Sequence, residues 1–282
     1  MANSLRNTHS TKSERTWHTD MKVINHKEFA NGQVFALKLE DGMLIETTDT
    51  FLPYYTKDAS SQHSNAIHGK YWVGDRSERW MVGVSTMSGC PVKCKFCAAG
   101  KLKKWRNLTA GEIVDQVMFV RERNHGNDPI FCKEFKINYT RMGEPFLNIH
   151  NVRKAITAIT ELHPKTHHYV STIGLKGSDF SWIKDNITLQ ISLHSLDEER
   201  RKWLIPINNL MTLEELGAIR TGSNLKTTIN LTLVDTKDFD ITKLRKYFDP
   251  KYFFVKLSPI NENDISKGND LGKGVIEQLN LV

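Results

Sequence analysis

The sequence predicts an α/β fold in which a partial (β/α)6 barrel follows a small N-terminal β-hairpin extension. First, short apolar runs alternate with amphipathic helical stretches after Trp80, a pattern typical of parallel β/α units. Second, about six such units are too few for a complete eight-stranded barrel, so a partial barrel or an open sheet is expected. Third, two runs of alternating apolar and polar residues flank Asp41-Gly42 within residues 32–52, as in a hairpin.

Strands and helices are predicted in turn along the core. The clearest helix starts after Thr109, because Glu112 three residues later completes a capping box. One side of this helix is apolar, which predicts a buried face made of Ile113, Val114, Val117 and Val120. Further helices are expected at 149–162, 213–220 and 241–248, and strands at 81–85, 135–139, 169–172, 189–192, 228–233 and 253–258.

Three segments are expected along the chain. Residues 1–30 form a flexible N-terminal arm, residues 31–79 a small β extension and loop, and residues 80–282 the core domain. The composition, 39% hydrophobic and 25% charged, excludes a disordered protein. No apolar run approaches the roughly 20 residues that span a bilayer, and the first residues lack the apolar stretch of a secretory signal. We therefore expect a soluble, cytoplasmic protein with no membrane partner.

The charge balance favours a polyanionic partner. Lys and Arg number 39 against 32 acidic residues, a formal charge of +7, and basic residues bind RNA by releasing condensed counterions. One basic cluster surrounds Trp105 and could grip phosphates while the indole stacks on a base. A solvated loop is the alternative for this cluster, which comprises Lys101, Lys103, Lys104 and Arg106.

Three of the four cysteines form a compact motif directly after a predicted strand. Cys90, Cys94 and Cys97 have the spacing C-x3-C-x2-C, and three thiolates on one loop can ligate three irons of a [4Fe–4S] cluster. The fourth iron is then open to the amino and carboxylate groups of S-adenosylmethionine. An electron from the cluster would cleave the sulfonium and release a 5′-deoxyadenosyl radical. Barrel folds place their chemistry at this end of the strands.

Other interpretations of the cysteine motif stay open. A structural zinc site would need a fourth ligand such as His125 or Cys132, but neither has the spacing of a zinc finger. A ferredoxin-type carrier would need a fourth cysteine, and Cys132 lacks the C-P signature. Chance clustering of unrelated thiols is the third alternative.

The cysteine motif and several ordered segments together resemble a known family. The text C-x3-C-x-Phe-Cys followed by RNLTAGEIVDQV is similar to the radical SAM rRNA and tRNA adenine methyltransferases of the RlmN/Cfr type. The resemblance implies a radical SAM partial barrel, a [4Fe–4S] cluster, S-adenosylmethionine, an external one-electron donor of the flavodoxin or ferredoxin type, and an RNA or nucleotide substrate. It also covers LEDGMLIET at 39–47, RMGEPFLNIHNV at 141–152, VSTIG at 170–174, ISLHS at 191–195, IPIN at 205–208 and LSPIN at 257–261.

The resemblance also implies roles for single residues. Phe96 would pack beside the adenine of S-adenosylmethionine, while Gly143 and Glu144 would bind its amino group, since a carboxylate suits a cation. Residues at the ends of two strands would line its ribose and carboxylate, and Asn261 would hold the adenine from the last strand. These strand-end residues are Ser171, Ser192, Leu193 and His194. Capping of neighbouring backbone is the alternative role for the serines and the histidine.

The sequence departs from the family at its thiols. Family members carry a cysteine seven residues before the cluster motif, where this chain has Gly83, and a methyl-carrying cysteine in a C-terminal segment, whereas no cysteine follows Cys132 here. Neither glycine nor water can replace a thiol that accepts a methyl group. Only about 30 residues precede the matching hairpin, so the family's N-terminal accessory domain is expected to be missing.

Two more residues carry open alternatives. Glu46 matches the glutamate that serves the family as proton acceptor, or it is an ordinary surface glutamate on a strand. Cys132 could replace a missing thiol, although a buried, inert cysteine is favoured.

Three functions follow. The favoured one is an enzyme that cleaves S-adenosylmethionine reductively and modifies a nucleotide or RNA base. The alternatives are an RNA adenine methyltransferase with a non-standard methyl acceptor or a thiol from a partner, and a degenerate, non-catalytic RNA-binding member of the family.

Overall fold

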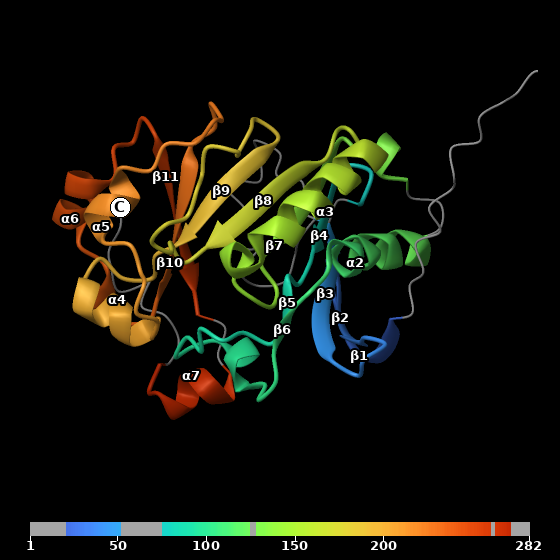
Figure 1. Cartoon of the computed structure of the whole chain (residues 1–282), viewed down its shortest axis with the longest axis horizontal. Helices are drawn as coiled ribbons and strands as arrows, with labels where there is room; N and C mark the ends of the chain where they lie inside the picture. The colour runs from blue at the N-terminus through green and yellow to red at the C-terminus, as the bar shows by residue number, and fades with distance from the viewer. Residues whose placement is uncertain (1–20, 52–74, 125–127, 261–262, 272–282) are drawn as a thin grey trace, which may run out of the picture.

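A single nine-stranded sheet forms the centre of the molecule (Figure 1). The structure is a computed structural model that describes residues 21–51, 75–124, 128–260 and 263–271. The strands follow one another across the sheet almost in chain order: β1 (Lys22–Phe29), β2 (Gly32–Lys38), β3 (Leu44–Phe51), β4 (Arg79–Gly83), β7 (Glu134–Tyr139), β8 (His167–Thr172), β9 (Ile187–Ser192), β10 (Thr227–Leu233) and β11 (Phe253–Pro259).

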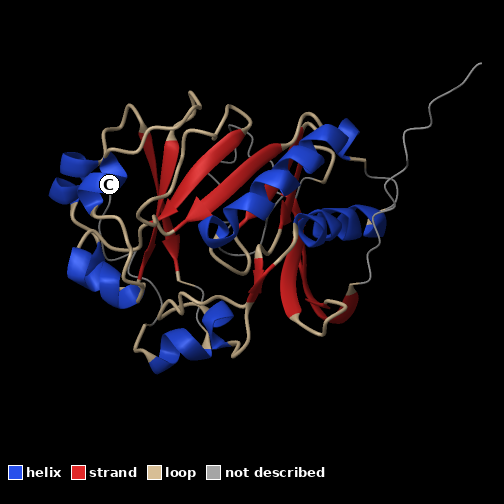
Figure 2. Cartoon of the chain, in the orientation of Figure 1, coloured by secondary structure: helices blue, strands red, loops and turns tan. Residues whose placement is uncertain are grey.

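The six strands from β4 to β11 run parallel, which confirms the predicted partial (β/α)6 arrangement. The paired strands end at β1 on one side and β11 on the other, so the described sheet is open (Figure 2). Each expected core strand is present within about two residues of its predicted bounds. Because parallel strands share one direction, the loops that follow β4, β7, β8, β9 and β10 all emerge at the same edge of the sheet.

The N-terminal hairpin is confirmed and has one strand more than expected. Strands β2 and β3 are antiparallel around the turn at Asp41-Gly42, and β3 pairs with β4, so the hairpin extends the core sheet. The sequence analysis placed residues 1–30 in a flexible arm, whereas Lys22–Phe29 form β1, which pairs with β2. All eight side chains of β1 are exposed, so no buried face imposed the apolar alternation by which strands are recognised.

Helices α2 (Ala110–Arg123) and α3 (Ile149–Leu162) pack against each other on one face of the sheet (Figure 1). The predicted capping box of α2 is present: Glu112 donates its backbone N–H to the Thr109 hydroxyl and accepts the N–H of Thr109. The apolar face predicted for α2 is buried in the main core, as Ile113, Val114, Val117 and Val120.

The remaining helices are short. α5 (Leu213–Gly217) ends three residues earlier than predicted and α6 (Ile241–Tyr247) matches its prediction closely. Helices α4 (Glu198–Leu204) and α7 (Asp264–Gly268) were not predicted. They are too short and too polar to show the repeat of apolar residues by which an amphipathic helix is recognised. Two-residue strands and single 3-10 turns complete the described elements: β5 (Met87–Ser88), β6 (Arg106–Asn107), η2 (Ala98–Lys101), η3 (Pro129–Phe131), η4 (Pro145–Asn148) and η5 (Thr236–Asp238).

The apolar interior has two parts. The main core lies between the sheet and its helices, and a second apolar cluster packs around the cysteine loop. Val92 and Cys90 of that loop contact residues of this second cluster, which also contains Ile173, Leu175, Leu204, Ile205, Leu210, Ile260 and Leu271. Every helix in the described ranges is too short or too polar to span a bilayer.

Candidate cofactor site and adjoining cavity

The loop with the three predicted cluster cysteines lies between β5 and η2, and Cys97 is the N-cap residue directly before η2. Backbone bonds hold the loop: Cys97 donates its N–H to the carbonyl of Cys94 at 3.1 Å, and Lys95 donates to Leu204 at 2.9 Å. Helix α7 clamps the same loop, since Asn263 donates its side-chain amide to the Phe96 carbonyl and Asn269 donates to that of Lys95. The loop is thus fixed by segments from the far end of the chain.

The three thiols are free, partly to fully buried, and electrostatically coupled. Burial raises the pKa of Cys90 to about 11 and raises those of Cys94 and Cys97, and in Cys94 the two other thiols add to the effect. Such thiols become thiolates only beside a positive partner, and iron of a cluster is one. Among the described residues, no three His, Cys, Asp or Glu side chains are grouped so that they could hold a single metal ion. A [4Fe–4S] cluster does not need such a group, because each of its three thiolate ligands would bind a different iron.

Glu144 lies immediately beside this loop, at the carboxyl end of β7. Its side chain is 4% exposed, and it contributes to the raised pKa of both Cys90 and Cys94. Its two oxygens accept the N–H groups of Phe146 at 3.1 Å and Ile173 at 3.0 Å, which ties the loop after β7 to that after β8. Burial raises the pKa of Glu144 to about 7, and hydrogen bonds from Thr172 and the backbone lower it in part. A buried carboxylate of this kind suits a cationic amino group.

Gly143 is required where it stands. Its φ is +105°, and a side-chain carbon there would lie 2.6 Å from Cγ of Met87. The backbone before Glu144 therefore packs directly against β5, next to the cysteine loop.

The strand-end residues are brought together at the same edge. The hydroxyls of Ser171 and Ser192 lie 3.1 Å apart, and the ring of His194 contacts that of Phe96 edge-on with centroids 4.6 Å apart. His194 is buried with φ of +62°, its Nδ1 accepts the N–H of Thr232, and burial lowers its pKa to about 3, so it is a neutral acceptor.

Two of the proposed binding residues contribute less. The side chain of Leu193 is fully buried in the main core. Asn261 lies outside the described residues.

A cavity of about 540 Å³ opens beside Phe96 and Cys97. Glu46 of β3 and Arg141 after β7 form an ion pair in its wall, and both side chains are about one third exposed. Hydroxyl and amide groups from the ends of β10, β11 and α7 also line it, namely those of Thr232, Ser258 and Asn263. The cavity therefore adjoins the cysteine loop at the carboxyl edge of the parallel strands.

Comparison with known proteins agrees with this geometry. Residues 84–246, more than half of the chain, match the radical SAM superfamily. The chain belongs to that superfamily. Its fold also matches the crystal structure of a radical SAM methyltransferase from Sphaerobacter thermophilus, with a TM-score of 0.63, 24% identity, and coverage of 92% of this chain and 72% of that one.

Named relatives of this radical SAM chain are RNA methyltransferases. The dual-specificity RNA methyltransferase RlmN of Nitratiruptor sp. is 32% identical over 77% of this chain and 59% of its own length. The probable dual-specificity RNA methyltransferase RlmN of Heliobacterium modesticaldum is 32% identical over 72% of this chain and 49% of its own length. The chain thus spans about half the length of the curated relatives it matches.

Gly83 is the last residue of β4 and directly precedes the segment that matches the radical SAM superfamily. It pairs with Thr48 across β3 and β4, and its N–H donates to the Thr48 hydroxyl at 3.1 Å. A side-chain carbon at Gly83 would lie 2.3 Å from Oγ1 of Thr48 and 3.0 Å from Cδ of Arg141. These two side chains fill the space that a thiol at this position would need, and neither was predicted to be a site residue.

Cys132 is an interior residue of this radical SAM fold. It is 6% exposed, belongs to the main core, and its thiol donates to the Glu134 carbonyl. Burial raises its pKa, so it stays a thiol. The expected burial of Cys132 is confirmed.

The basic cluster around Trp105 is only partly free. Trp105 is 49% exposed and Lys103 and Lys104 are exposed, whereas Arg106 is bound to Asp41 and Glu112. Those two carboxylates raise the pKa of Arg106. Arg106 therefore joins the hairpin to α2, and it is not available for phosphates.

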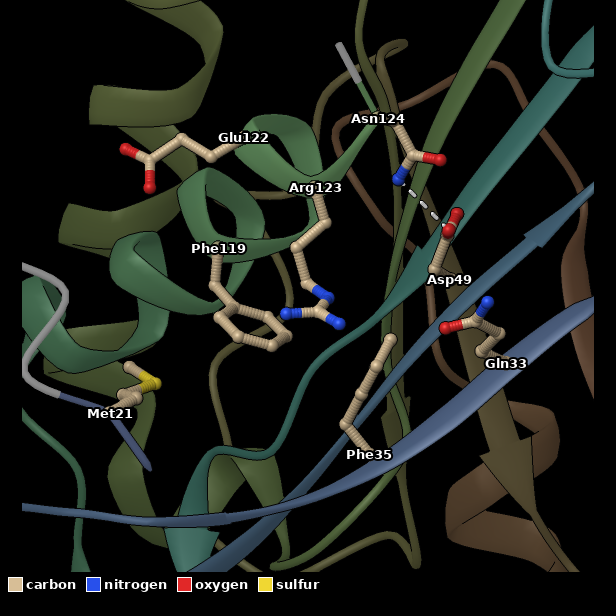
Figure 3. Close-up of a pocket in the computed structure, with 8 residues that line it drawn as sticks. All are labelled: Met21, Gln33, Phe35, Asp49, Phe119, Glu122, Arg123 and Asn124. Atoms are coloured by element: carbon tan, nitrogen blue, oxygen red, sulfur yellow. Dashed lines mark hydrogen bonds between the residues drawn. The ribbon is translucent and has the colours of Figure 1, made fainter. Parts of the chain in front are cut away.

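A second cavity, of about 520 Å³, lies between the hairpin and α2 (Figure 3). The guanidinium of Arg123 lies over Phe35 and Phe119, 5.2 and 5.4 Å from their centroids. Asp49 accepts a bond from Asn124 in this wall and further bonds from Arg76 and Trp80. The contacts of Arg123 with Phe35 and of Asp49 with Asn124 thus join the hairpin to the end of α2.

Proposed function

We propose that this radical SAM enzyme binds a [4Fe–4S] cluster through Cys90, Cys94 and Cys97 and cleaves S-adenosylmethionine beside it to modify a nucleotide or RNA base. When bound, the cluster supplies the electron that splits the sulfonium and yields a 5′-deoxyadenosyl radical. The observation that carries the proposal is the set of three buried or partly buried thiols on one loop, adjacent to Glu144 and to the cavity.

The chain's own residues would hold the cosubstrate around this loop. Glu144 would accept the amino group of S-adenosylmethionine, because in the described part of the chain its buried carboxylate accepts bonds only from neutral donors. Phe96 would pack beside the adenine, and the backbone of Gly143 is fixed next to the same loop. Asn261 would hold the adenine. The ribose and the carboxylate would be lined by the strand-end residues Ser171, Ser192, Leu193 and His194.

Glu46 would act as the proton acceptor in the cavity. Its backbone is tied to the hydroxyl of Ser85, which accepts the Glu46 N–H and donates to its carbonyl, and its carboxylate is paired with Arg141. The relatives that are named RNA methyltransferases support RNA as the substrate class, and an external flavodoxin or ferredoxin would deliver the electron.

Anaerobic reconstitution tests the proposal. The protein should take up about four irons with sulfide and, with dithionite and S-adenosylmethionine, release 5′-deoxyadenosine, faster when RNA is added. Cys94→Ala should lose the cluster absorbance and the 5′-deoxyadenosine, whereas the control Cys132→Ala should keep both, because Cys132 lies in the main core. Zinc in place of iron and sulfide would refute the proposal.

The same assay separates the alternatives. Methylated adenine in the treated RNA would indicate methyl transfer by a non-standard acceptor, since the space at Gly83 is filled. RNA binding with an intact cluster but without 5′-deoxyadenosine would indicate a non-catalytic protein.

A further inference from the structure

The charge of the cavity is concentrated in one pair. Among the described residues that line it, Arg141 is the one Lys or Arg side chain and Glu46 the one carboxylate, and the two pair with each other. The remaining lining is apolar or carries neutral hydroxyl, amide and thiol groups. A ligand in this cavity therefore meets a single guanidinium and a single carboxylate.

Arg141 is held in position from three sides. Its backbone N–H donates to the Val84 carbonyl at 3.2 Å, and its aliphatic stem lies over Gly83, where a side-chain carbon would approach Cδ and Cγ at 3.0 and 3.3 Å. Glu46 then fixes the guanidinium at the end of that stem. The missing side chain at position 83 is what lets Arg141 reach across β4 to β3.

The guanidinium has donor capacity left over. It carries five N–H donors, and a terminal nitrogen contacts the Glu46 carboxylate. In the part of the chain that the structure describes, Nε of Arg141 is buried and has no hydrogen-bond partner. A buried donor without an acceptor is costly, and anionic oxygens are the acceptors that a guanidinium binds best, often two at once.

We propose that Arg141 is the specificity-determining residue of this cavity and binds an anionic oxygen group of the substrate, a phosphate or a carboxylate. The proposal rests on the proposed function in that the cavity beside the cysteine loop is the substrate site. It names the substrate class: a molecule that carries such a group close to the reacting atom. The guanidinium would bind this group beside Gly83, where the stem of Arg141 occupies the space that a side chain would need.

Anion binding to the reconstituted protein tests the proposal without turnover. Inorganic phosphate and acetate are titrated calorimetrically into protein saturated with S-adenosylmethionine, and the anion that matches the substrate should bind and weaken as salt rises. Arg141→Gln should weaken that binding at least tenfold, and Arg141→Lys should retain part of it because the charge is kept.

Arg79→Gln is the matched control. Arg79 pairs with Glu134 at 2.9 Å, and its side chain is 42% exposed against 34% for Arg141, but it does not line the cavity. The substitution Arg79→Gln should therefore leave anion binding unchanged.

The outcomes separate the two proposals. Binding of neither anion, or equal binding by wild type and Arg141→Gln, would overturn the role of Arg141 even if 5′-deoxyadenosine is formed. Anion binding that is seen without S-adenosylmethionine but abolished by it would also overturn this role, because Arg141 would then bind the carboxylate of the cosubstrate. Loss of 5′-deoxyadenosine with anion binding intact would count against the proposed function alone.

Discussion

Replacing Gly83 with cysteine introduces the thiol that the family resemblance leads one to expect at this position, and the structure predicts that this change destabilises the fold. The new carbon would lie 2.3 Å from Oγ1 of Thr48 and 3.0 Å from Cδ of Arg141, both well inside normal contact. Overpacking of this kind costs about 1–3 kcal/mol. Moving the Thr48 hydroxyl also breaks its bond to the N–H of residue 83, worth about 1 kcal/mol. We expect Gly83→Cys to lower the free energy of unfolding by about 2–4 kcal/mol.

Urea denaturation of single and double variants measures this. Thr48→Ala alone should cost about 1 kcal/mol through the lost hydrogen bond, but in the Gly83→Cys background it makes room and should restore stability. Gly111→Cys is the control, because the nearest atom to a side-chain carbon there is 3.8 Å away. Wild-type stability in Gly83→Cys, or costs of the two changes that simply add, would refute the steric reasoning.

Three further predictions concern the site and the fold. Burial raises the pKa of Glu144 from 4.5 to about 7, so its protonated form stabilises the fold below pH 4.5 and this stabilisation is lost as pH rises through 7. Relative to Glu144→Gln, the unfolding free energy of the cluster-free wild type should therefore fall by about 3 kcal/mol between pH 4 and 8, and a pH-independent difference would contradict the shift. Gly143→Ala should weaken cluster retention on gel filtration and lower the melting temperature, because the added carbon meets Met87 at 2.6 Å; an unchanged melting temperature would argue against that packing. Thr109→Ala removes the cap of α2 and should cost about 1 kcal/mol in urea, unless the capping box contributes nothing.

Much of the fold was predictable because its signals are local. The capping box of α2 and its apolar face lie within a dozen neighbouring residues, and the six core strands show as short apolar runs. Strand β1 escaped because none of its side chains is buried, and α4 and α7 because they are only seven and five residues long.

The candidate site was predictable in its composition but not in its contacts. The spacing of Cys90, Cys94 and Cys97 and the match at Gly143-Glu144 both reside in short stretches, and the structure brings these stretches side by side. Arg141 lies in the same matching segment, two residues before Gly143, yet nothing in that segment signals its pairing with Glu46.

The sequence by itself determined the superfamily, the parallel α/β arrangement and the three-cysteine loop, because each depends on patterns of residues that are close together along the chain. Only the tertiary structure decided what fills the place of the missing thiol. Thr48, Gly83 and Arg141 come from three separate segments, and a glycine leaves no local trace of which side chain will occupy its space. That choice depends on the pairing of β3 with β4 and on the loop after β7, so it exists only once the sheet has formed.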